Sequence, residues 1–129
     1  MSRSRLLPIG DAAALLAFVA VGLSQHGEGA VATLFLRNVV PLLGAWFVVA
    51  RAVGTYSRPG VRTLLITWVI AVPAGLLLRT VWVGSPHGSE IAVFLGVGLA
   101  FTLLFLSIGR TMARALGHRR APTTSRVVR

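Results

Sequence analysis

The chain has 129 residues, of which 55% are hydrophobic and 12% are charged, and its formal net charge is +10. This low fraction of charged residues leaves too little polar surface to cover a soluble globular protein. The composition therefore indicates an integral membrane protein. Cysteine does not occur in the sequence, which excludes disulfides, thiolate nucleophiles and cysteine-based metal sites.

Four apolar runs are each about as long as a bilayer is thick, because a hydrocarbon core of about 30 Å needs roughly 20 helical residues. In chain order, we expect transmembrane helices over residues 6–23, 30–50, 63–83 and 91–109. The runs lack the polar–apolar alternation of membrane β-barrels, so helices are favoured. The first run could instead be a cleaved signal peptide, although Asp11 within it argues against this alternative.

The predicted fold class is therefore all-α, a transmembrane bundle of four helices. We expect two regions: the bundle over residues 1–112, and a basic, disordered cytoplasmic tail over residues 113–129.

The arginines predict the orientation of these helices, because short cytoplasmic loops hold the excess of positive charge. They cluster before the first run, between the second and third, and after the fourth: Arg3, Arg5, Arg51, Arg58, Arg62, Arg110, Arg114, Arg119, Arg120, Arg126 and Arg129. Both termini should then be cytoplasmic, in a multi-pass protein of the plasma (inner) membrane. We expect this basic face to contact anionic lipid headgroups. Nucleic acid is not an expected partner, because no aromatic residues interleave with the arginines.

Asp11 is the most informative polar residue, because an ionisable side chain at membrane depth is costly unless it is paired or hydrated. One interpretation places it in the first turn of its helix, just after Pro8 and Gly10, where a carboxylate favours exposed backbone N–H groups. A second is an ion pair with Arg51 or Arg110. A role in proton relay or substrate binding is the third.

Arg37 and Arg79 lie toward the outer ends of the second and third helices, and Asn38 follows Arg37 directly. Pro41 and Pro73 occupy comparable positions in these helices and tend to kink them. These residues could serve packing alone, with Arg79 extending outward along its own stem. The sharper hypothesis is an outward-facing cationic pocket for a carboxylate, a phosphate or a lipid headgroup.

The two outer turns each supply one histidine and one glutamate: His26 and Glu28, then His87 and Glu90. These four residues are weak candidates for a metal site. Because Ser, His and Gly are common turn residues, ordinary turn chemistry is favoured, and we expect neither a metal nor a cofactor.

Small residues spaced four apart let membrane helices approach closely and self-associate, so they indicate a compact bundle and allow a homo-oligomer. The pairs are Gly10 with Ala14, Ala13 with Ala17, and Gly96 with Ala100.

The order and spacing of several motifs resemble the domain of unknown function 3054 family, small four-helix membrane proteins of actinobacteria and some archaea. The similar residues are Asp11, Gly22 to His26, Pro41 to Gly44, Trp68, Pro73, Gly75 to Arg79, Phe94, Gly109 and Arg110. The chain departs from the pattern at Leu23, where the family often has a basic residue that Arg37 could replace. It departs again at Val40, where an aromatic residue is common. The resemblance implies four membrane helices and no established activity.

No catalytic motif occurs: the chain lacks a nucleophile with a base at a recognisable spacing, a phosphate-binding glycine loop and a zinc-protease helix. We therefore expect that the protein is not an enzyme. The leading hypothesis is a structural or accessory membrane protein that holds an anionic lipid or group through Arg37 and Arg79. The alternative is a subunit of a small oligomeric transporter or channel, since four helices are too few to enclose a path alone.

Overall fold

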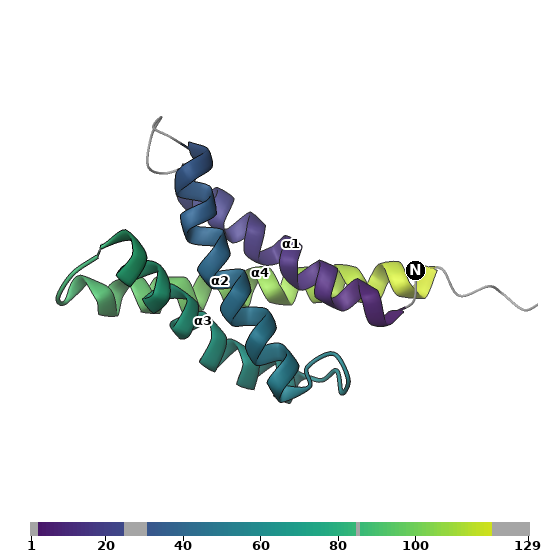
Figure 1. The fold of residues 1–129 in the computed structure, drawn as a ribbon. Helices are drawn as coiled ribbons and strands as arrows, with labels where there is room; N and C mark the ends of the chain where they lie inside the picture. Colours follow the sequence, from purple (N-terminus) through teal and green to yellow (C-terminus); the bar gives the residue numbers. More distant parts are fainter. Residues whose placement is uncertain (1–2, 25–30, 85, 120–129) are drawn as a thin grey trace, which may run out of the picture.

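A computed structural model describes residues 3–24, 31–84 and 86–119, and these form four helices and no strand. The helices are α1 (Arg3–Ser24), α2 (Val31–Val53), α3 (Val61–Val83) and α4 (Glu90–Arg119) (Figure 1). Each is long and apolar enough to cross a membrane. The predicted all-α class and its four transmembrane helices are confirmed.

Helix α1 begins earlier than predicted, which corrects the position of Asp11. The helix starts at Arg3 and includes Pro8, so Asp11 lies in the third turn rather than the first. The first-turn interpretation of Asp11 is therefore wrong. Pro8 is the sixth residue of α1 and has no backbone N–H, so the helix makes one hydrogen bond fewer at this position.

Helix α4 corrects the predicted tail, because it continues to Arg119. Residues 113–119 are therefore helical and not disordered. They contain good helix formers such as Ala and Arg and no proline, and Ala113 is buried on the side that faces α1. The remainder of the predicted tail, residues 120–129, lies outside the described residues.

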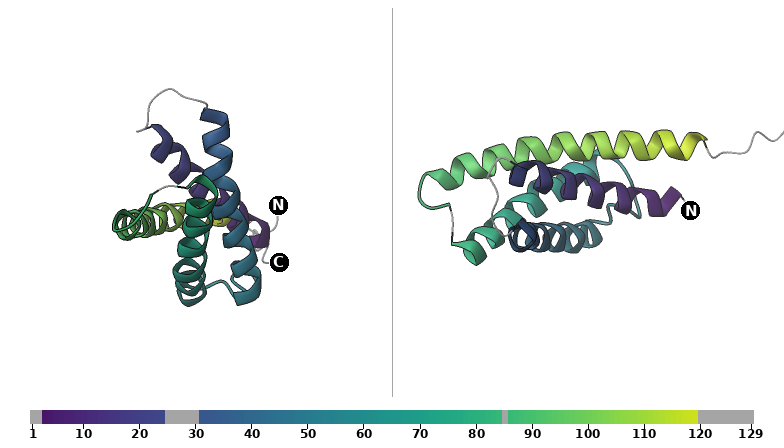
Figure 2. Two further views of the ribbon diagram at one scale, coloured as in Figure 1. Left: turned by 60° about the vertical axis from the view of Figure 1, so that its left-hand side comes forward. Right: turned by 90° about the horizontal axis from the view of Figure 1, so that it is seen from above.

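The helices form a ring in which each contacts its two neighbours in the order α1, α2, α3, α4. Helices α1 and α4 lie side by side and antiparallel, and the α2–α3 pair crosses them (Figures 1 and 2). The start of α1, the connection over residues 54–60 and the end of α4 therefore share one end of the bundle, here called the terminal end. The opposite end, which holds residues 84 and 86–89, is called the turn end.

The centre of the bundle is filled by fully buried side chains, and large apolar side chains cover its outside. The filled centre includes Leu15, Leu42, Trp46, Val72 and Leu106. On the outside, Val48, Val81 and Val93 are 71%, 84% and 68% exposed. Exposure of this kind costs free energy in water but none in lipid, so it fits the spanning assignment.

Glycines allow close approaches between helix backbones at two places. A Cβ on Gly75 of α3 would lie 2.9 Å from the Cα of Leu42 in α2. A Cβ on Gly109 of α4 would lie 3.0 Å from the carbonyl oxygen of Gly10 in α1. The predicted Gly10–Ala14 pair thus packs against α4. A Cβ on Gly96 would have no atom within 4 Å, so the predicted Gly96–Ala100 pair does not take part in these two contacts.

Candidate functional site

Asp11 forms a buried, two-point ion pair with Arg110. The Arg110 Nε donates to Asp11 Oδ1 at 3.0 Å, and Nη2 donates to Oδ2 at 2.8 Å. The Asp11 side chain is 0% exposed and the Arg110 side chain is 4% exposed. The pair joins α1 to α4, and it confirms the ion-pair interpretation of Asp11 with Arg110 as the partner. The other proposed partner, Arg51, is exposed.

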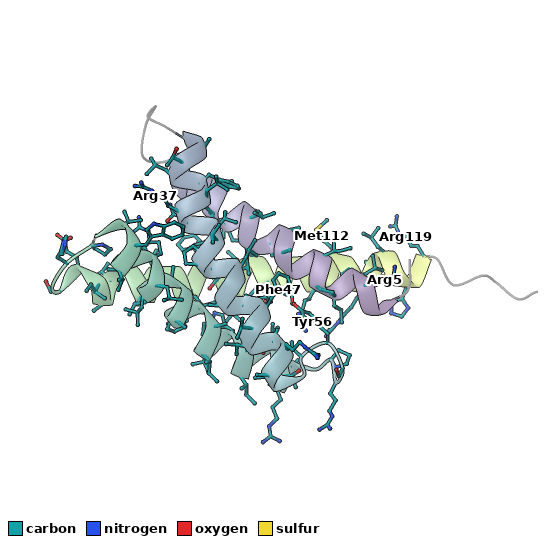
Figure 3. All side chains as sticks on the ribbon, viewed as in Figure 1. Arg5, Arg37, Phe47, Tyr56, Met112 and Arg119 are labelled. Atoms are coloured by element: carbon teal, nitrogen blue, oxygen red, sulfur yellow. The ribbon has the colours of Figure 1, made fainter. Side chains whose placement is uncertain are left out.

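Tyr56 and Trp46 extend this pair into a network that reaches α2. The Tyr56 hydroxyl donates to Asp11 Oδ2 at 2.9 Å, and Trp46 Nε1 donates to the Tyr56 oxygen at 3.0 Å. Tyr56 belongs to the connection between α2 and α3, so the network ties that connection to α1, α2 and α4. Figure 3 shows Tyr56 directed toward the interior at the terminal end of the bundle.

The hydrogen bonding favours a structural role for Asp11. Its carboxylate accepts three hydrogen bonds, which satisfy an ionised group and hold its position. Burial of Tyr56, and then the Asp11 charge, raise the pKa of the phenol well above its ordinary value. Tyr56 therefore stays a neutral donor at physiological pH, and the network holds one balanced pair of charges.

A second polar group lies in the half of the bundle toward the turn end and joins α2, α3 and α4. Arg79 Nε donates to Asn38 Oδ1 at 2.8 Å, and the Arg79 guanidinium carbon lies 5.0 Å from the centre of the Phe94 ring. Asn38 is itself fixed, because its Nδ2 donates to the carbonyl oxygen of Leu34 at 2.6 Å. The structure thus brings together two of the predicted site residues, Asn38 and Arg79.

These residues line a cavity of about 120 Å³ to which all four helices contribute. Its wall is mainly apolar and includes Leu23, with Arg79 and Asn38 as its polar side chains. Leu23 stands where the resemblance implies a basic residue, so a longer cationic side chain at this position would enter the same cavity. Arg37 is exposed on α2 and does not line the cavity, so it does not replace that residue here (Figure 3).

The candidate metal residues do not form a site in the part of the chain that the structure describes. His87 and Glu90 are exposed near the turn end. His26 and Glu28 lie outside the described residues. Within residues 3–24, 31–84 and 86–119, no three His, Cys, Asp or Glu side chains are grouped closely enough to hold a metal ion.

Neither Tyr56 nor Trp46 was predicted from the sequence as a partner of Asp11. Tyr56 is the single tyrosine of the chain and lies in a connection, where helical periodicity carries no information about burial. A tyrosine close to Asp11 in the sequence would have suggested this hydrogen bond. Tyr56 is instead 45 positions away, so the contact depends on how the helices pack.

Comparison with known proteins gives a family and no activity. No curated protein and no solved structure matches the chain. Residues 8–113 match a family described as "Protein of unknown function (DUF3054)". This range contains the Asp11–Arg110 pair, Tyr56 and the cavity at Arg79. Since the match covers most of the sequence, the chain belongs to the DUF3054 family.

Proposed function

We propose that this protein is a non-enzymatic accessory protein of the plasma membrane that holds a small anionic group in the cavity at Arg79. The observation that supports this function most directly is the fixed position of the Arg79 side chain within a cavity shared by all four helices. The positive-inside pattern favours cytoplasmic termini, and in that orientation this cavity would lie in the outer half of the membrane.

An arginine at membrane depth costs free energy, because its charge is removed from water. An arginine near a helix end can lower this cost by extending to the interface. Arg79 instead is half-buried, with Nε bound to Asn38 and the guanidinium over the Phe94 ring. Arg79 lines the cavity, and the planar guanidinium group of an arginine suits contact with a carboxylate or a phosphate.

The size of the cavity restricts the class of ligand. A volume of about 120 Å³ holds a few water molecules or one small anionic group. Its mainly apolar wall lowers the local dielectric and strengthens an ionic contact with Arg79. We therefore propose a carboxylate or a phosphate group, either free or at the end of a larger molecule that extends out of the cavity.

The test compares Arg79→Gln with Arg37→Gln, which removes an exposed arginine on a neighbouring helix. Melting temperatures of the detergent-purified proteins are measured with inorganic phosphate and with acetate, against chloride at equal ionic strength. We expect phosphate or acetate to stabilise the wild type and Arg37→Gln, and to leave Arg79→Gln unshifted. Leu23→Arg should increase the shift, because it adds a second cation to the cavity wall. Equal shifts in the wild type and Arg79→Gln would contradict the proposal.

A second candidate function is a subunit of an oligomeric transporter or channel. It is favoured by the open face of α4 at Gly96 and Ala100, where another copy could approach closely. Fully buried Leu15, Leu42 and Leu106 fill the centre of one copy, so a path would have to run between copies. Native mass spectrometry separates the two functions: a trimer or larger ring supports transport, and a monomer or dimer supports the accessory function.

A further inference from the structure

A second cavity, of about 340 Å³, lies at the terminal end of the bundle, beside the network of Asp11, Arg110 and Tyr56. Arg110, Arg114 and Tyr56 are its polar wall, and Leu6 and Ala113 are among its apolar residues. It is larger than the cavity at Arg79 and lies at the end that carries most of the arginines, which is the cytoplasmic end in the proposed orientation.

The charge of this cavity is positive. Asp11 forms its ion pair with Arg110. Glu90, the other acidic residue among the described residues, lies at the turn end. Arg114 follows Arg110 by one helical turn and is exposed. The Asp11–Arg110 pair therefore balances itself, and Arg114 gives the cavity wall a net positive charge.

An apolar groove adjoins this cavity between α1 and α4. It has a volume of about 410 Å³ and an almost entirely apolar wall, with small residues such as Ala13 and Ala17 along α1. Leu6 and Ala113 line both the groove and the cationic cavity. Figure 2 shows α1 and α4 running side by side over this length. A molecule with an anionic head and an apolar chain could therefore occupy both spaces at once.

The length of the groove matches one leaflet of a bilayer. On α1 its lining extends from Leu6 to Ala17, which corresponds to about 16 Å at 1.5 Å per residue. Half of a hydrocarbon core of about 30 Å is nearly the same. The groove thus begins beside the cationic cavity and ends near the middle of the membrane, as an acyl chain does.

We propose that the cationic cavity and the groove together bind one anionic phospholipid from the leaflet at the terminal end. The lipid phosphate contacts Arg114 and the edge of Arg110, and one acyl chain lies in the groove between α1 and α4. A second copy of this protein could fill an apolar groove, but an apolar helix face would leave the adjoining positive charge unmatched. This site is separate from the cavity at Arg79 and does not depend on the function proposed for it.

The experiment measures lipid retention by native mass spectrometry of the full chain in detergent, with phosphatidylglycerol and phosphatidylcholine of identical acyl chains added in equal amounts. We expect one phosphatidylglycerol to be retained in preference to phosphatidylcholine. Arg114→Gln should weaken this preference about tenfold, since it removes a charge-assisted contact. Its control, Arg119→Gln, removes an exposed arginine of the same helix that does not line the cavity and should behave as wild type.

A second variant tests the groove. Ala13→Phe should fill it and reduce retention of both lipids, whereas Ala20→Phe adds the same ring at another exposed position of α1 and should not. Unchanged melting temperatures confirm that these variants fold, and Arg79→Gln should retain phosphatidylglycerol as the wild type does, which distinguishes the two sites.

Three results would overturn the lipid proposal: equal retention of the two lipids by the wild type, full retention by Ala13→Phe, or displacement of the lipid by inorganic phosphate alone. Loss of a dimer in Ala13→Phe without loss of lipid would assign the groove to a second copy instead.

Discussion

Asp11 shows how a single residue can decide the packing of a membrane protein. Its carboxylate is shared between Arg110 and Tyr56, which come from different parts of the chain. An ion pair in lipid repays its desolvation only when its geometry is good and its other hydrogen bonds are made. Both conditions hold here, so the pair fixes which faces of α1 and α4 meet.

Removal of one partner should therefore cost more than removal of both. Asp11→Asn leaves the Arg110 charge buried without a counterion, and we expect a loss of about 3–5 kcal/mol in the free energy of unfolding. Arg110→Met should cost a similar amount, and the double variant Asp11→Leu/Arg110→Met should recover much of it. Denaturant unfolding in detergent measures all three. Glu90→Gln is the control because Glu90 is exposed, and additive losses in the double variant would refute the coupling.

Tyr56 gives a pH dependence that can be read directly, because it is the single tyrosine of the chain. Its pKa in the folded protein is raised by burial and by the Asp11 charge, whereas the unfolded chain should titrate at about 10. Below that pH the phenol is protonated in both states and adds no pH dependence. Above it the unfolded chain loses its proton first, so stability falls as the pH rises.

The phenolate absorbance of the folded protein should therefore appear at a higher pH than that of the denatured protein. Tyr56→Phe should remove the phenolate signal and the corresponding part of the alkaline decrease in stability. Coincident titration curves for the folded and denatured chains would show that the phenol is not buried.

At the scale of helices, the α2–α3 crossing depends on Gly75. A Cβ at this position would meet backbone atoms of α2, at 2.9 Å from Leu42 Cα and 3.2 Å from the Pro41 oxygen. Backbone atoms cannot move aside as a flexible side chain can. The small residue therefore sets how closely these two helices approach, and with it the distance between Asn38 and Arg79.

Gly75→Ala should destabilise the protein by about 1–3 kcal/mol, the usual cost of overpacking. Gly44→Ala is the matched control on the partner helix, because a Cβ there would have no atom within 4 Å. It should be neutral or slightly stabilising, since alanine favours helix. Thermal unfolding of both variants in detergent checks the difference. A loss in Gly44→Ala equal to that in Gly75→Ala would mean that the crossing is not the cause.

At the scale of the whole molecule, every helix runs antiparallel to the next, so the two described chain ends lie at the same end of the bundle (Figure 2). The arginine distribution then predicts on which side of the membrane this end lies. The absence of cysteine from the sequence makes this side easy to determine, since any introduced thiol is unique.

Ser57→Cys and Ser89→Cys place single thiols at exposed positions at the terminal end and the turn end. A membrane-impermeant maleimide should label Ser89→Cys in intact cells, and should label Ser57→Cys only after permeabilisation. The reverse pattern would show the opposite orientation, and would move the proposed phospholipid site to the outer leaflet.

The sequence by itself determined the number, type and approximate position of the helices. Length and hydropathy suffice for this, because each helix satisfies its own backbone hydrogen bonds and must cross a hydrocarbon layer of known thickness. Sequence also identified Asp11, Arg37, Asn38 and Arg79 as the polar groups whose depth needs an explanation, and it named Arg110 as one of two possible partners of Asp11. The sequence-based helix bounds were wrong at two ends, because α1 begins at Arg3 and α4 continues to Arg119. An apolar run can end before the hydrogen bonding of its helix does.

Only the tertiary structure decided which polar groups meet. Arg110 rather than Arg51 pairs with Asp11, Tyr56 and Trp46 complete that network, and Arg79 rather than Arg37 lines the cavity. The physical reason is that hydropathy averages over all faces of a helix, whereas a hydrogen bond depends on the rotation of each helix about its axis. That rotation is set by contacts between small residues of neighbouring helices. Such contacts join residues that are distant in sequence, so they cannot be predicted from one segment alone.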